Sequence, residues 1–363
     1  MRGKRSVKLF IAAVSIVLVV LVAVQLYTRH MINKQFGRAE HPDIATSWLY
    51  YEDYEAEFPR EAVSFISGGN RLQGYIYGAD NAKGLVVVAH GIGVGHERYI
   101  DEIIWFADQG WRVFAYDATG SVESEGRGTR GLPQSALDLD HALSYIAEDS
   151  ELSQLPVFLF GHSWGGYAVT AVLNFDHTVT ASASLSAYSE PMEMMQSYAA
   201  GMEGIPQDLV YPFMWLDTFI RFGRHVNLSA YEGVNKSDIP ILIVHGTRDG
   251  LIPFDGPSLI AKKDQITNPQ VQYLSLSNPG QDNHDTIFYD ASALAYIEEV
   301  NERYLALHTR YNGLVPEQER EAFYETIDKR LVNRVNEALM REIQSFFEDS
   351  LVTAVTAASP GSK

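Results

Sequence analysis

A serine flanked by glycines stands where a strand-like segment runs into a helix-like one. The apolar run 156–161 ends in the sequence GHSWGG (161–166), with the serine at 163, and an amphipathic stretch follows. Small neighbours are needed at such a tight turn, because a larger Cβ would collide with the adjacent strand or helix. The helix N-terminus beneath the hydroxyl favours the negative charge that develops during acyl transfer. The pattern predicts that Ser163 is a nucleophile, with an ordinary turn as the alternative.

A nucleophilic serine needs a base, and the base needs an acid that fixes its tautomer. Asp249 follows the apolar run 240–246, and His284 follows the run 271–277. Both therefore stand in loops at the carboxyl ends of predicted strands. The chain order serine, aspartate, histidine is the order that this kind of nucleophile turn predicts.

Each of these two residues has another interpretation. Asp249 could simply cap a helix, which is common for an aspartate after a strand, and Asp255 is then the next acid. His284 could be a solvated loop histidine. The other histidine in the C-terminal part, His308, falls inside a predicted helix.

Two backbone N–H groups are predicted to form an oxyanion hole. One belongs to Trp164, the residue after the nucleophile, and the other to Ile92 in the loop HGIGVG (90–95). Glycines let that loop approach a substrate closely, although it could also be a plain strand-end turn. We expect His90 and His162 to be structural, because neither position gives a base in line with the nucleophile.

The elements that must position these residues alternate along the chain. A hairpin is predicted over 62–78 around Gly68-Gly69-Asn70. Amphipathic stretches at 97–109 and 135–148 lie among apolar runs that are typical of buried strands: 84–90, 111–117, 156–161, 178–187, 240–246 and 271–277. Such alternation predicts an α/β fold with a mostly parallel sheet covered by helices on both faces.

Two stretches interrupt this alternation. The first, 189–238, is predicted to be a lid over the carboxyl ends of the strands, where ligands bind in such sheets. It is rich in large apolar residues that suit an acyl chain or plain packing: Met192, Met194, Met195, Met202, Phe213, Met214, Trp215 and Phe219. The second is a C-terminal extension, with long solvated helices over 287–309 and 316–349 and a break at Asn312-Gly313. Residues 351–363 are expected to be a disordered tail.

The N-terminus predicts a membrane anchor. Residues Leu9–Leu26 carry no charge and are long enough to span a bilayer, and no clear cleavage site follows them. We therefore expect an uncleaved signal anchor over 1–27, with a cleaved signal peptide or a buried core helix as the alternatives. A stalk over 28–60 would join it to a body over 61–350, which we expect to lie outside the cytoplasm.

Composition excludes several classes of protein. The 363 residues include no cysteine, so thiolate nucleophiles, disulfides and cysteine metal sites are ruled out. The net charge is −18, and beyond residue 38 the chain has 21 basic against 46 acidic residues, which argues against nucleic-acid binding. Neither metal-ligand spacing nor a phosphate-binding loop is present, and we expect no metal and no cofactor.

Together these motifs resemble the α/β-hydrolase superfamily over about residues 60–310. The matching segments are AHGIG, YDATGSVESEG, GHSWGG, HGTRDGLIP and NHDTIF. The resemblance implies an oxyanion loop at Ile92, a structural loop at Asp117, a nucleophile at Ser163, an acid at Asp249 and a base at His284. It looks closest to the esterase, lipase and serine-aminopeptidase-like branch. One departure is that the sequence DATG at 117–120 lacks the arginine usual in that motif.

The resemblance implies acyl transfer to water. The leading hypothesis is hydrolysis of carboxylic esters, with a small-molecule or lipid-like ester as substrate. A serine peptidase would use the same residues on amides. A catalytically inactive binding protein on a hydrolase scaffold is the alternative from another class, since a fold never guarantees a function.

Overall fold

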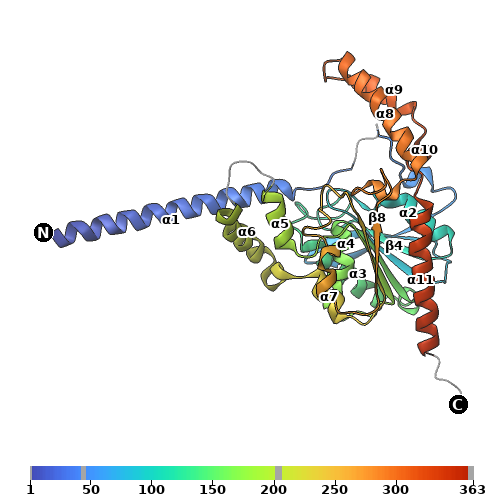
Figure 1. Ribbon diagram of the computed structural model, residues 1–363, viewed down its shortest axis with the longest axis horizontal. Helices are drawn as coiled ribbons and strands as arrows, with labels where there is room; N and C mark the ends of the chain where they lie inside the picture. Colours follow the sequence, from blue (N-terminus) through green and yellow to red (C-terminus); the bar gives the residue numbers. More distant parts are fainter. Residues whose placement is uncertain (1, 42–45, 201–206, 359–363) are drawn as a thin grey trace.

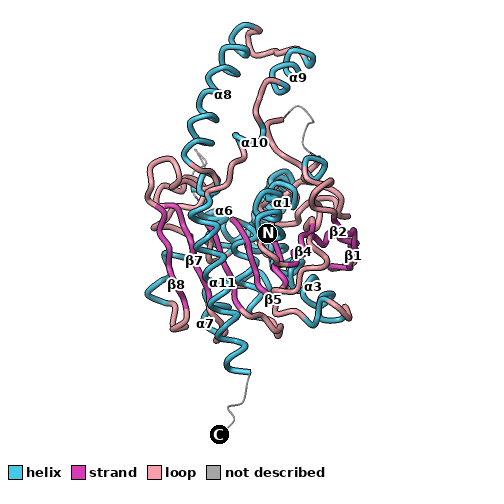
Figure 2. Tube along the Cα trace, turned by 90° about the vertical axis from the view of Figure 1, so that its right-hand side faces the viewer, coloured by secondary structure: helices cyan, strands magenta, loops and turns pink. Residues whose placement is uncertain are grey.

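One eight-stranded sheet organises the chain (Figures 1 and 2). The computed structural model describes residues 2–41, 46–200 and 207–358. The strands lie in the order β1-β2-β4-β3-β5-β6-β7-β8. Their bounds are β1 Arg60–Ser67, β2 Asn70–Tyr77, β3 Leu85–Ala89, β4 Arg112–Tyr116, β5 Val157–His162, β6 Ala181–Leu185, β7 Ile241–Gly246 and β8 Val271–Leu276. Among the eight strands β2 alone runs opposite to the others, so the predicted mostly parallel sheet is confirmed.

The two faces of the sheet carry separate cores, because successive side chains of a strand point to opposite faces. In β3, Leu85, Val87 and Ala89 belong to one core, and Val86 and Val88 to the other. The first core is covered by α3 (Gln134–Glu148), α4 (Trp164–Ala171) and α7 (Ala230–Lys236). The second is covered by α2 (Ile100–Asp108) and α11 (Glu337–Ala358). The central strands are therefore buried on both sides.

The C-terminal extension differs from its predicted form. The break at Asn312-Gly313 is present, with φ angles of 48° and 87°, and it ends α8 (Ala291–Arg310). The single helix predicted over 316–349 is wrong: the structure has α9 (Glu317–Glu325), α10 (Lys329–Val332) and α11. The Asp328 side chain accepts the N–H of Leu331 at 3.1 Å and so starts a new helix at α10.

Helix α11 is a core element, not a solvated one. Its side chains Ile343, Phe346 and Phe347 are buried in the second core, and Phe347 packs against Phe158 of β5 with ring centroids 5.1 Å apart. The helix also continues to Ala358, so the tail expected to be disordered from 351 is helical over most of its length. Residues 359–363 lie outside the described ranges.

The N-terminal helix α1 (Arg2–Gln35) extends beyond the predicted span. By length and composition Ser6–Gln35 could cross a membrane. Its apolar side chains from Val7 to Val22 are exposed, whereas Ile32 is buried in the first core. The segment after it, predicted as a stalk, packs onto the body instead. Arg38 donates to the carbonyls of Ser124 at 2.8 Å and Gly126 at 3.0 Å, and Ala39 forms a β-bridge with Ser121. Helix α1 is thus joined to the body without an extended stalk.

The lid segment lies between β6 and β7. It contains α5 (Pro191–Ala200), α6 (Gln207–Phe222) and α7, and Met202 falls outside the described residues. Met192, Met194, Met195 and Met214 are buried in the same core as Trp164. Single turns of 3₁₀ helix complete the fold: η1 Tyr51–Asp53, η2 His96–Tyr99, η3 Leu152–Gln154, η4 Val172–Asn174, η5 Gly223–Asn227, η6 Ile260–Gln265 and η7 Thr286–Phe288.

Candidate active site

Ser163 stands at the turn between β5 and α4 in a strained backbone conformation. Its φ of 57° and ψ of −115° are rare for a residue with a side chain and cost about 1–3 kcal/mol. The flanking glycines make the turn possible. A Cβ on Gly161 would lie 2.3 Å from the carbonyl oxygen of Gly165, and one on Gly165 would lie 1.9 Å from that of Ala89. The sequence therefore holds the serine at a turn that packing with the neighbouring strand enforces.

The loops after β7 and β8 bring Asp249 and His284 together. Asp249 Oδ2 lies 2.7 Å from His284 Nδ1. The other carboxylate oxygen, Oδ1, accepts the N–H groups of Leu251 at 2.9 Å and Ile252 at 2.8 Å. When Nδ1–H donates to the carboxylate, Nε2 of His284 is free to accept a proton. Asp255 is exposed, and within the described ranges it makes no hydrogen bond with His284.

A second histidine, His245, supports the same carboxylate. Its Nε2 donates to the Ile252 carbonyl at 2.9 Å and lies 3.3 Å from Asp249 Oδ2. Burial by itself raises the pKa of Asp249, but the hydrogen bonds from His245 and His284 outweigh it and hold that pKa well below its ordinary value. Asp249 is therefore anionic at neutral pH. His245 was not among the predicted site residues. Its position four residues before Asp249, near the end of a buried strand, was a signal for it.

The side chain of His284 lies next to the residue that precedes Ser163. The imidazole of His284 packs against that of His162, the residue before Ser163, with ring centroids 4.7 Å apart. Ser163 is partly exposed while His284 is buried. Among the described residues no hydrogen bond joins Ser163 Oγ to His284. Catalytic hydrogen bonds often tighten only when substrate is bound, so this geometry fits a nucleophile and base in the free state.

The predicted oxyanion N–H groups have no intramolecular partner. Within the described part of the chain, neither the N–H of Ile92 nor that of Trp164 donates a hydrogen bond. The loop that carries Ile92 also runs beside the serine, since a Cβ on Gly91 would lie 3.7 Å from the Cβ of Ser163. Both donors are therefore available to an anion that forms next to Ser163.

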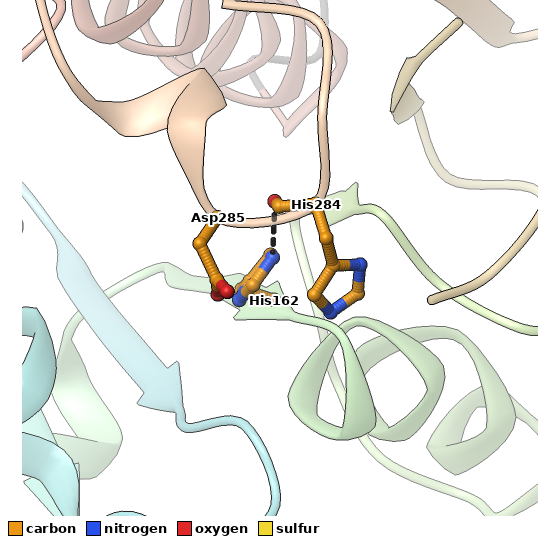
Figure 3. Close-up of side chains that lie close together, drawn as sticks. All are labelled: His162, His284 and Asp285. Atoms are coloured by element: carbon orange, nitrogen blue, oxygen red, sulfur yellow. Dashed lines mark hydrogen bonds between the residues drawn. The ribbon is translucent and has the colours of Figure 1, made fainter. Parts of the chain in front are cut away.

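A chain of hydrogen bonds joins the loop that carries Ile92 to the loop that carries His284, here called the histidine loop. Tyr99 Oη accepts the N–H of Gly91 at 3.1 Å and donates to His162 Nδ1 at 2.8 Å. On its other side, His162 Nε2 donates to the carbonyl oxygen of His284 at 3.1 Å (Figure 3). Burial and the nearby His284 lower the pKa of His162 well below its ordinary value, so its ring is neutral and able to accept from Tyr99.

His162, His284 and Asp285 also have the composition of a metal site. One ligand atom from each lies within 4.8 Å of the others. The close-up draws the three side chains together (Figure 3). A metal on His162 would have to replace the hydrogen bond to Tyr99 or the one to the His284 carbonyl. The hydrogen bonds explain the position of His162 fully, and we assign it to the support of the two loops.

Asp117 and His90 hold the loop beside the site. Asp117 Oδ1 accepts from the N–H of His96 at 2.9 Å and from its Nδ1 at 2.8 Å. Burial raises the pKa of Asp117, but the interactions with His96 lower it to about 2. His90 Nε2 accepts the N–H of Ala118 at 2.9 Å, and its Nδ1 donates to the Gly91 carbonyl at 2.7 Å. Both ring nitrogens of His90 are thus engaged, as expected for a structural residue.

Comparison with known proteins finds a family model and relatives that match part of this chain. A family model described as serine aminopeptidase, S33, matches residues 80–211, less than half of the chain. The uncharacterized protein YfhR of Escherichia coli strain K12 is 25% identical over 228 residues, which cover 59% of this chain and 72% of the relative.

Solved structures share the architecture at low identity. An esterase from Pyrococcus furiosus, Pf2001, superposes with a TM-score of 0.51 and 18% identity, covering 75% of this chain and 98% of its own. An alpha-beta hydrolase from Vibrio vulnificus gives a TM-score of 0.53 and 17% identity, covering 77% and 93%. At this identity the likeness establishes the fold.

Proposed function

We propose that the chain is a membrane-anchored serine hydrolase of the α/β-hydrolase superfamily that cleaves carboxylic esters, which its fold and the matching family model support. The observation that carries the proposal is the 2.7 Å hydrogen bond between Asp249 and His284, beside a serine held at a strained turn. Acid, base and nucleophile come from three separate loops at the carboxyl ends of the strands. Packing alone does not require this arrangement.

The proposed first step forms an acyl-enzyme. His284 Nε2 takes the proton of Ser163 Oγ as the oxygen attacks the ester carbonyl carbon. The carbonyl oxygen becomes an anion, which the N–H groups of Ile92 and Trp164 stabilise. Collapse of this intermediate breaks the bond to the alcohol, which leaves with the proton from His284. Asp249 remains ionised throughout and stabilises the transient imidazolium.

Water completes the cycle by the reverse use of the same residues. His284 Nε2 takes a proton from water as its oxygen attacks the acyl carbon on Ser163. The same N–H groups hold the second oxyanion. Ser163 leaves with the proton, and the carboxylic acid is released. No cofactor takes part in the proposed mechanism.

Amide hydrolysis is the second candidate, because the matching family model is described as serine aminopeptidase. The proposed acyl-enzyme steps apply to amides with an amine as leaving group. A panel of short-chain esters and aminoacyl amides with matched acyl groups separates the two. We expect ester turnover to exceed amide turnover, and the opposite ratio would make the protein a peptidase.

We also propose that α1 remains attached as an anchor and that the body lies outside the cytoplasm. Its exposed apolar surface and the packing of residues 36–39 on the body support an uncleaved helix. The mass of the protein recovered from membranes tests this, since cleavage after the apolar segment would remove more than 20 residues. Protease protection of the body in sealed cells tests the side of the membrane.

The activated serine is tested with a fluorophosphonate probe on the full chain in detergent micelles. We expect the wild type to label at Ser163, and the variants Ser163→Ala and His284→Ala to lose labelling. His308→Ala, in exposed α8, is the matched histidine control and should label like the wild type. A folded wild type that stays unlabelled would overturn the proposal in favour of an inactive binding protein.

A further inference from the structure

Helices α1 and α6 run side by side in the same direction (Figure 1). Three polar contacts join them at successive turns: Gln25 Nε2 to the Phe213 carbonyl at 3.3 Å, Arg29 to Asp217 at 3.6 Å, and Arg221 to Asn33 Oδ1 at 2.8 Å. From one contact to the next, both helices advance by four residues, about one helical turn. The two helices are therefore in register, with position 213 level with 25.

The outward face of α6 is apolar. Each exposed position lies three or four residues from another one, at 209, 212, 216, 219 and 220, which places them on one face of the helix. They are Leu209 (68% exposed), Pro212, Leu216 (41%), Phe219 (44%) and Ile220 (57%). Asp208 is the one charged exposed residue among the described side chains of α6. The opposite face carries buried Met214, Asp217 and Thr218.

The register fixes the depth of this face relative to the anchor. Counting back one turn from the first contact puts Leu209 level with Leu21, inside the uncharged segment Leu9–Leu26. Ile220 is level with Ile32, beyond it. A bilayer that covers α1 as far as Leu26 therefore also meets the first turns of α6, and the last turns lie at the headgroup boundary.

We propose that the apolar face of α6, formed by Leu209, Pro212, Leu216, Phe219 and Ile220, is inserted in the lipid leaflet from which α1 emerges. The proposal rests on the proposed function for its consequence, that the substrates are amphiphilic esters taken from that leaflet. A lipid surface is favoured over a protein partner because the face continues the exposed apolar surface of the anchor.

The same helices connect the leaflet to the candidate active site. Met192 and Met195 of α5 and Met214 of α6 pack in the core that contains Trp164, the neighbour of Ser163. Arg130 ties the far end of α6 to the body by donating to the Arg221 carbonyl at 3.2 Å.

Because the chain has no cysteine, single-cysteine variants can report the depth of each position. Leu209→Cys, Leu216→Cys and Ile220→Cys would carry a nitroxide on the full chain in phosphatidylcholine vesicles. Collisions with oxygen and with a water-soluble nickel chelate are then compared. Leu305→Cys on α8, 65% exposed, is the matched control.

We expect the label at 209 to show at least threefold less nickel access, relative to oxygen access, than the label at 305. The difference should shrink from 209 to 220. Equal values at 209 and 305 would overturn the proposal. Labels at 209 shielded from both reagents and broadened by one another would overturn it in favour of a second copy of this chain. The measurement needs no turnover, so it is independent of catalysis.

Delivery of substrate is tested by the double variant Leu209→Asp/Leu216→Asp. Placing two carboxylates in the leaflet should lower hydrolysis of a vesicle-embedded ester about tenfold. Hydrolysis of a short water-soluble ester should stay unchanged. Equal loss on both esters, or no loss on either, would overturn the delivery claim. If the wild type cleaves neither ester, the proposed function fails while the depth result stands.

Discussion

Two groups of helices project from the sheet, and they differ in how they join it. One consists of α5 and α6 beside α1, and the other is the arm formed by α8, α9 and α10 (Figure 1). The first group shares its buried methionines with the main core. The arm has a small cluster of its own around Val300, Ile327 and Val332.

The exposed surfaces of the two groups differ as well. The outward face of α6 is apolar, while α8 and α9 expose glutamates such as Glu298, Glu302 and Glu317. At its root, however, the arm contacts the histidine loop: Asn336 donates its N–H to the Phe288 carbonyl at 2.6 Å and its side-chain amide to the Ile287 carbonyl at 2.9 Å. Under the proposals above, the lid side faces substrate and membrane, and the arm acts only through its root.

If catalysis depends on the loops between these two groups of helices, replacing the proposed acid Asp249 should have the largest effect on activity. Asp249→Asn should lower kcat/KM for a short-chain ester about 10⁴-fold, because it removes the charge that fixes the His284 tautomer. Asp255→Asn, six residues on and exposed, is the control and should change kcat/KM less than twofold. Similar losses of kcat/KM in the two variants would show that Asp249 is not the acid of the site.

Helix α2, which covers the second core, contains a buried carboxyl whose ionisation weakens the fold. Burial, with a contribution from Asp101, raises the pKa of Glu102 from 4.5 to about 8. Between these values the folded protein keeps a proton that the unfolded chain has lost, so stability falls as pH rises from about 4.5 to about 8.

Glu102→Gln removes this dependence. Relative to the wild type, its free energy of unfolding should rise by roughly 4 kcal/mol between pH 5 and pH 9, measured by urea unfolding. Glu148→Gln, on the exposed side of α3, should follow the wild type at both pH values. If the free energy of unfolding of Glu102→Gln changes with pH as that of the wild type does, ionisation of Glu102 does not destabilise the folded protein.

One ion pair in each projection has the same i,i+4 spacing but a different environment. Arg221 pairs with the buried Asp217 at 2.6 Å in the lid, and Arg303 pairs with Glu299 at 3.5 Å on the arm surface. Arg221→Ala should cost about 3 kcal/mol of stability, because it leaves a buried carboxylate poorly compensated. Arg303→Ala should cost less than about 1 kcal/mol. Chemical unfolding in micelles measures the stability of both variants. Equal losses would show that the two ion pairs contribute alike despite their different burial.

The smallest effect concerns two tyrosine hydroxyls that each accept a backbone N–H at 3.1 Å. Tyr99 accepts from Gly91 beside the site, and Tyr296 accepts from Asp328 in the arm. Tyr99→Phe should lower kcat about tenfold with little change in KM, because the oxyanion loop and the histidine loop lose their link through His162. Tyr296→Phe should leave kcat unchanged. A normal kcat in Tyr99→Phe would show that this link does not position the site.

Several parts of the fold could be predicted because their signal is local. The alternation of buried strands and amphipathic stretches follows from side-chain periods of two and 3.6, and glycines around Ser163 follow from a turn that excludes Cβ atoms. The division of 316–349 into three helices could not be read this way, since α11 owes its place to Phe346 and Phe347 fitting a face made by β5 and α2.

The sequence by itself determined the order of the elements and the loop that carries each of Ser163, Asp249 and His284, because strand ends and turns are set by near neighbours in the chain. Only the tertiary structure decided that Tyr99 and His162 link two loops, and that α6 lies in register with α1. These contacts join residues far apart in the sequence or on different loops, and no local pattern encodes which of many polar side chains will meet once the sheet has formed.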